Sequence, residues 1–180
     1  WKITKPRDEI KAMKEFVDQK NKNLRKLCKM ARAWKNKHGV GMGGLLIDTL
    51  AYNFLKSRTD YDNRSAAFYD RMCRDFFLYL SEEPNKDYYL ALGSNQRVNV
   101  KSKFQRKAKK TYDLCCDAIA AGENDSANKK WKKVFGRPFP SATKAEARSI
   151  AKAFKDTEQF IEDLYPLDIR FNLKIECEVS

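Results

Sequence analysis

Histidine is almost absent from this 180-residue chain, since His38 is the only one. A Ser-His-Asp triad, a Cys-His pair or a His-based metal centre would therefore depend on one side chain, which stands just before a glycine-rich stretch. The five cysteines are odd in number and form no C-x-x-C pair, which argues against a disulfide framework and a zinc site. We expect them to be small buried side chains in a reducing cytosol.

Long apolar runs and a signal peptide are missing as well. No stretch approaches the roughly 18 apolar residues that a membrane-spanning helix needs, and no basic start leads into an apolar segment. The chain is nevertheless 42% hydrophobic and 12% aromatic, which is enough to bury one core. We therefore expect a folded cytoplasmic protein with no membrane partner.

Positive charge is in excess and unevenly distributed. The net charge is +13, but residues 1–140 hold 31 Lys and Arg against 16 Asp and Glu, whereas residues 141–180 hold 6 against 8. The composition thus changes near Pro140, where we place a domain boundary. A field of this size attracts polyanions without distinguishing nucleotides from nucleic acid.

Apolar side chains recur at helical spacing through most of residues 1–140 and predict a mainly α fold. Helices are expected from Pro6 to an end near Asn21 to Asn23, from Leu24 to a left-handed cap at Gly39, and from Gly44 to Leu55. Further helices are expected at about 64–80, 101–121 and 125–135. Residues 82–99 contain Pro84, Gly93 and several Asn, and predict a structured loop anchored by Tyr88, Tyr89 and Leu90.

Beyond Pro140 the pattern changes. Thr143 and Glu146 have capping-box spacing and predict a helical connector over residues 141–156. In residues 157–180, apolar and polar side chains alternate from Leu167 to Val179, which predicts a long half-buried strand. Because no earlier segment is a convincing mate for it, we expect the chain to be a fragment that stops at the start of a β-rich domain.

The second helix is the most informative segment. Its apolar side holds Leu24, Leu27, Cys28, Ala31 and Trp34, and its roughly opposite side holds Lys22, Arg25, Lys26, Lys29 and Arg32. No acid interrupts residues 20–37. A solvated charged face and an anion-binding face are both compatible with this pattern.

The order LRKLCKMARAWKNKHG, a turn of small residues, GLLIDTLAYNFL and later WKKVFGRPFP resembles the C-terminal helical half of bacterial nucleotidyltransferases of the polymerase-β superfamily. The likeness is to cyclic-oligonucleotide synthases related to cyclic GMP-AMP synthase and the oligoadenylate synthetases. It implies a helical lobe that helps make a cyclic or linear oligonucleotide messenger from NTPs, in bacterial antiviral signalling. Residues 157–180 resemble the start of the C-terminal sensor domain of some of these synthases.

The resemblance also implies a site for the donor triphosphate. The family has a K-x-W core on its basic helix, and the matching triplet here is Arg32, Ala33 and Trp34, with Lys29 one turn earlier. The family often has a serine at the head of the next helix, where this chain has Gly43 and Gly44 and offers backbone N–H groups instead. We expect Lys29, Arg32, Gly43 and Gly44 to bind the triphosphate, and Arg32→Ala to leave thermal stability nearly unchanged.

The catalytic carboxylates of that family have no counterpart in this chain. They follow a Gly-Ser motif in the N-terminal lobe and hold Mg²⁺. Here Asp60 and Asp62 belong to a polar segment that predicts a turn, and Gly93-Ser94 has no carboxylate pair after it. We therefore expect no catalytic or metal-binding residue in this chain, with Mg²⁺ bound by an N-terminal lobe outside it.

Two other functions remain open. The basic run Lys101, Lys103, Arg106, Lys107, Lys109 and Lys110 is typical of a helix that binds a phosphate backbone, so a non-catalytic module that binds nucleic acid is the alternative. A solubilising helix surface explains the same run. A purely structural interaction domain is the third possibility, because the strand predicted after residue 166 needs a partner.

Overall fold

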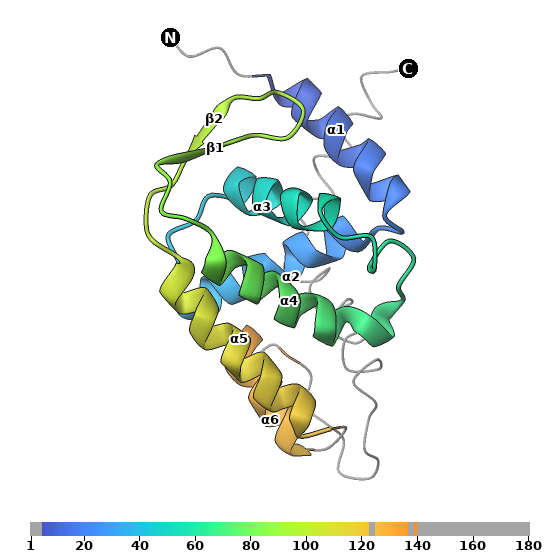
Figure 1. Cartoon of the computed structure of the whole chain (residues 1–180), viewed down its shortest axis with the longest axis vertical. Coiled ribbons are helices and arrows are strands. Elements are labelled where there is room, and N and C mark those ends of the chain that lie inside the picture. Colours follow the sequence, from blue (N-terminus) through green and yellow to red (C-terminus); the bar gives the residue numbers. More distant parts are fainter. Residues whose placement is uncertain (1–4, 123–124, 137–138, 140–180) are drawn as a thin grey trace.

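The computed structural model describes residues 5–122, 125–136 and 139, and these residues form a mainly helical fold (Figure 1). The N-terminal helices are α1 (Pro6–Gln19), α2 (Asn23–His38) and α3 (Gly44–Lys56). A short 3-10 helix, η1 (Ala66–Phe68), precedes α4 (Tyr69–Glu82), and two short strands follow, β1 (Tyr88–Leu90) and β2 (Arg97–Asn99). Helices α5 (Gln105–Ala120) and α6 (Asp125–Phe135) come last.

Helix α2 lies at the centre of the fold, with contacts to α1, α3, α4 and α6. Its predicted apolar side is confirmed, because all five of those side chains are buried. The predicted apolar face of α3 is buried in the same way, at Leu46, Ile47, Leu50, Ala51, Phe54 and Leu55. Both faces contribute to one continuous core.

The basic helix ends where the sequence predicts. Gly39 adopts the left-handed conformation (φ 57°), and the N–H of Val40 donates to the Lys35 carbonyl at 2.9 Å. Val40 is itself buried, at 3% exposure. This pairing and burial are characteristic of a Schellman C-cap. The Lys107 ammonium from α5 also donates to the His38 and Gly39 carbonyls, at 2.8 Å each.

Three of the predicted elements differ in the structure. Helix α5 begins at Gln105 rather than at about residue 101. Helix α4 begins at Tyr69 rather than near Arg64, because η1 occupies residues 66–68. The loop expected over residues 82–99 is a β-hairpin, in which Tyr88, Tyr89 and Leu90 pair with Asn99, Val98 and Arg97. Only Tyr89 of the three predicted anchors is buried, since Tyr88 is 38% and Leu90 is 54% exposed.

Helices α5 and α6 pack against each other at one end of the molecule (Figure 1). The indole N–H of Trp34 in α2 donates to the Thr111 hydroxyl of α5 at 2.7 Å, and both residues are buried. Helix α6 buries Trp131, Val134 and Phe135, as the sequence predicts. The connector at 141–156 and the strand predicted in 157–180 lie outside the described residues, as does most of the proposed boundary near Pro140.

Candidate functional site

The turn between α2 and α3 places Arg32 beside the first residues of α3. Nη2 of Arg32 donates to both carboxylate oxygens of Asp48, at 2.6 and 2.8 Å. The Arg32 and Asp48 side chains are only 22% and 17% exposed. Since Asp48 lies in the second turn of α3, this ion pair links the two helices at their shared end.

The Cys28 thiol lies in the same neighbourhood, one turn before Arg32 on α2. It is 3% exposed. Burial raises the pKa of Cys28 well above its ordinary value; the Asp48 carboxylate raises this pKa further and the Arg32 guanidinium opposes that effect. Cys28 is therefore a protonated packing residue rather than a nucleophile.

The N-terminus of α3 is open. Gly43 is its N-cap residue, and among the described residues no side chain caps the helix. Gly43 and Gly44 are both exposed. A Cβ on Gly44 would lie 3.8 Å from Nη2 of Arg32, and a Cβ on Gly43 would meet nothing within 4 Å. The structure thus brings three of the four predicted site residues together: a guanidinium next to uncapped backbone N–H groups, which is an arrangement that suits an anion.

The fourth predicted residue, Lys29, is placed differently. It precedes Arg32 by one turn but is only 8% exposed, so it offers a ligand little surface. Farther along the predicted basic side, Lys22 and Arg25 are exposed and Lys26 is half-buried. The basic side is thus exposed at Lys22 and Arg25, at the start of α2, and half-buried or buried from Lys26 to Arg32.

Asp48 is the functional residue that sequence reasoning missed. A signal was present, because Asp48 is the only acid between Asp18 and Asp60 and it directly follows the apolar run Leu45, Leu46 and Ile47. An acid in that position on a buried helix needs a cationic partner. The structure also changes the expectation for Arg32→Ala, since removing one partner of a half-buried ion pair lowers stability.

The turn at Asp60 to Asn63 is confirmed as a turn. The buried side chain of Asn23 holds it by donating to the carbonyls of Tyr61 and Arg64, at 2.6 and 3.0 Å. Asp62 pairs with Lys20, while Asp60 is exposed. Within residues 5–122, 125–136 and 139, no three His, Cys, Asp or Glu side chains are grouped as a metal site.

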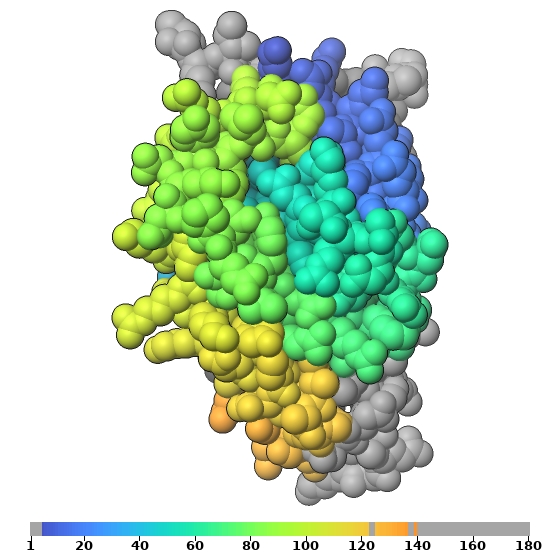
Figure 2. Space-filling view, in the orientation of Figure 1, coloured from blue at the N-terminus to red at the C-terminus, as the bar shows by residue number. Residues whose placement is uncertain are grey.

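The predicted basic run around α5 is exposed at all six positions. Lys107 caps α2, and Lys109 pairs with Asp113 at 3.3 Å. Across the described part of the chain, the remaining four cations have no acidic partner; they are Lys101, Lys103, Arg106 and Lys110. The yellow surface of α5 follows one margin of the molecule, and long side chains extend from it (Figure 2).

The lone histidine has a structural role. Nε2 of His38 lies 2.9 Å from the Val134 carbonyl, to which it donates. Burial lowers the pKa of His38, and Lys37 and Lys107 lower it further, against the opposing effect of this hydrogen bond. A neutral imidazole that ties the end of α2 to α6 is therefore the state that the fold favours.

None of the described helices has the length and apolar character needed to cross a membrane. Comparisons of the chain with models of protein families, with curated proteins and with solved structures found no match.

Proposed function

We propose that this chain is the nucleotide-binding helical lobe of a nucleotidyltransferase that makes an oligonucleotide messenger from NTPs. The observation that carries the proposal is the position of the Arg32 guanidinium beside the open N-terminus of α3 at Gly44. The sequence resemblance supplies the reaction class. The catalytic carboxylates and their Mg²⁺ belong, in this proposal, to a lobe outside the chain.

A triphosphate fits the site formed by Arg32 and the N-terminus of α3 for two reasons. Arg32 offers a planar cation that binds phosphate oxygens in pairs, and the first N–H groups of α3 add hydrogen-bond donors where the helix dipole favours negative charge. The glycines at positions 43 and 44 place no side chain between a ligand and that backbone. The site therefore positions an anion and moves no proton.

Asp48 competes with the ligand in this proposal. Its carboxylate binds Nη2 of Arg32 in the manner in which two phosphate oxygens would bind it. A triphosphate must share or displace that contact, so the Asp48 charge should weaken nucleotide binding. The two members of one ion pair are thus expected to have opposite effects on nucleotide affinity.

Calorimetric titration of the chain with ATP tests this. Arg32→Ala should weaken ATP binding about tenfold or more, which corresponds to the loss of about 1.4 kcal/mol from a charge-assisted contact. Asp48→Asn should strengthen binding, because it releases Arg32 and removes a negative charge. Both variants should lose about 1–2 kcal/mol of unfolding free energy, since the half-buried pair is broken in each.

Arg25→Ala is the matched control. Arg25 lies on the same helix, two turns before Arg32, and is exposed. Its removal subtracts the same charge without touching the start of α3, so ATP affinity should change little. An Arg32→Ala variant that binds ATP as tightly as the unaltered chain contradicts the proposed site, because the ion pair would then serve stability alone.

The second candidate function is nucleic-acid binding by the basic surface of α5, which we define as Arg106 and Lys110 of the helix together with Lys101 and Lys103 just before it. It is favoured by the absence of acidic partners for these cations in the described residues. Each phosphate that such a cation neutralises releases counterions, so affinity should fall steeply with salt. A triple Lys103→Gln, Arg106→Gln, Lys110→Gln variant should reduce the slope of log affinity against log salt by about three.

Filter binding of a DNA or RNA duplex at several salt concentrations measures that slope. The control is a double Lys11→Gln, Lys14→Gln variant, which removes two exposed cations from α1. Lys107 is kept intact because it caps α2. If the unaltered chain binds no duplex near physiological salt, the second candidate is removed.

A further inference from the structure

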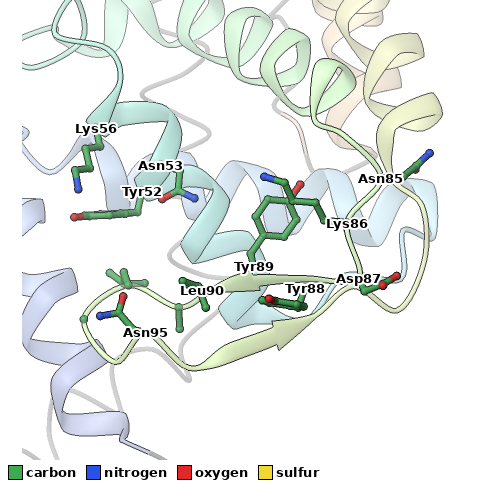
Figure 3. Close-up of a pocket in the computed structure, with 13 residues that line it drawn as sticks. Tyr52, Asn53, Lys56, Asn85, Lys86, Asp87, Tyr88, Tyr89, Leu90 and Asn95 are labelled. Carbon is green, nitrogen blue, oxygen red and sulfur yellow. The ribbon is translucent and has the colours of Figure 1, made fainter.

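A hollow of about 660 Å³ lies between α3 and the β-hairpin (Figure 3), and Arg32 is not among the residues that line it. It is lined by Tyr52, Asn53 and Lys56 of α3 and by most of the segment 85–95. A volume of this order is typical of sites for small ligands, which measure about 300–1,000 Å³. Neither the proposed triphosphate site nor the basic surface of α5 uses these residues.

Tyrosine rings are the most distinctive part of the lining. Tyr52 is held by Phe16 of α1, with ring centroids 4.5 Å apart. The Tyr89 hydroxyl donates to Glu83 at 2.6 Å, which fixes the second ring. Tyr88 is the third, and it is 38% exposed. Tyr89 is itself buried, at 6% exposure, and successive side chains of a strand point to opposite faces, so of these two neighbours Tyr88 is the ring with surface for stacking with a planar aromatic ligand.

Cations accompany these rings. The Lys56 ammonium lies 5.6 Å from the Tyr52 ring centroid, and that of Lys86 lies 5.0 Å from the Tyr89 centroid. The Arg97 guanidinium lies 4.4 Å from the Tyr88 centroid. Lys56 and Lys86 belong to the lining of the hollow, whereas Arg97 does not, and Asp87 is the single acid in the lining, so its charged side chains carry a net positive charge. An anionic group on the ligand is therefore favoured.

Hydrogen-bonding groups complete the lining. Val100 donates to the Asp87 carbonyl and Ala91 donates to the Gln96 carbonyl, so the register directs the N–H and C=O groups of Tyr88 and Leu90 away from β2. The amides of Asn53, Asn85 and Asn95 add further donors and acceptors. These groups match the edge of a nucleobase, which presents donors and acceptors side by side.

From this combination we infer that the hollow between α3 and the hairpin binds a nucleobase that carries a phosphate group. The base stacks on the exposed Tyr88 ring and bonds to the amides and the strand edge, while Lys56 and Lys86 bind the phosphate. A free nucleotide and single-stranded RNA both present this chemistry. A peptide strand added to β1 is disfavoured, because only two residues offer it free backbone groups and the charged, tyrosine-rich lining serves it less well.

Two-dimensional ¹⁵N NMR of the chain tests the inference locally, through the amide signals of Tyr88 and Leu90. The probes are AMP, a six-residue adenosine RNA and ribose 5-phosphate, which has the phosphate but no base. AMP and the RNA should shift both signals. Ribose 5-phosphate should shift them much less at the same concentration. Tighter binding of the RNA identifies a strand as the source of the base, and equal or tighter binding of AMP identifies a free nucleotide; both results support the inference.

Two sets of variants separate base from phosphate. Tyr88→Ala should weaken AMP binding about fivefold or more, with little effect on ribose 5-phosphate. A double Lys56→Gln, Lys86→Gln variant should weaken both ligands. Phe68→Leu is the control for the ring, since Phe68 also has a guanidinium over its face, at 4.4 Å, but lies outside the hollow. It should leave the affinity unchanged.

The inference does not depend on the proposed triphosphate site, because Arg32→Ala should leave the Tyr88 and Leu90 shifts intact. It is overturned if AMP and the RNA both leave those signals unmoved, or if ribose 5-phosphate binds as well as AMP. It is also overturned if an extended Thr-Val peptide shifts the signals and AMP does not, since the hollow would then be a site of strand addition.

Discussion

Gly93→Ala should lower the free energy of unfolding by about 2–4 kcal/mol. Gly93 lies in the turn between β1 and β2 with φ +73°, a conformation that costs a residue with a Cβ roughly 1 kcal/mol. A Cβ there would also lie 2.3 Å from the Asp8 carbonyl oxygen and 2.8 Å from the Ala12 Cβ. Because the first of these atoms is helix backbone, α1 must shift to relieve the overlap.

Gly122→Ala is the control for this substitution, measured by chemical unfolding with circular dichroism. Gly122 has the same φ of +73°, but a Cβ there would meet nothing within 4 Å. Its substitution should therefore lower the free energy of unfolding only by the cost of a positive φ for a residue with a Cβ, about 1 kcal/mol. Equal losses in the two variants would mean that the hairpin turn tolerates a methyl group, and that α1 is not held closely against it.

Trp34→Ala should cost about 3–5 kcal/mol, which is a large part of the total stability of a domain. Trp34 is fully buried, and its ring centroid lies 5.0 Å from that of Phe77. Its indole N–H donates to Thr111, whose hydroxyl in turn donates to the Lys107 carbonyl at 2.9 Å. Truncation thus leaves a cavity where α2, α4 and α5 meet.

Because that variant is at risk of not folding, Trp34→Phe and Thr111→Val separate packing from hydrogen bonding. Thr111→Val should cost about 1–3 kcal/mol, since it leaves the buried indole N–H without an acceptor. The double variant should cost about 1 kcal/mol less than the sum of the two single changes. Strict additivity in chemical unfolding would show that the 2.7 Å contact contributes nothing.

The parts of the fold that were predictable depend on local sequence. The buried faces of α2 and α3 follow from helical periodicity, and the end of α2 follows from a glycine at the one position that requires a left-handed conformation. The hairpin was missed because its strands have only three residues each and its turn has no Asn-Gly pair. Nothing in so short a strand distinguishes it from a loop.

The candidate site also has one part that was predictable from local sequence and one part that was not. The proximity of Arg32 to Gly44 follows from the short turn between two helices, which the sequence predicts. The pair between Arg32 and Asp48 depends on the angle at which α3 crosses α2, and the burial of Lys29 depends on how the helices pack together. Local periodicity carries no information about helix crossing angles or about contacts between helices. The sequence therefore predicted Lys29 as a binding residue, although it is buried, and gave no prediction for Asp48.

The attachment of α5 to α2 has a mechanical consequence. The two helices are joined at Trp34 by a hydrogen bond to Thr111 and at the last carbonyls of α2 by Lys107. Arg32 lies only two residues before Trp34, so the helix that carries the Arg32 guanidinium is also the helix to which α5 is attached. We therefore expect a displacement of α5 to be passed to α2 through these hydrogen bonds.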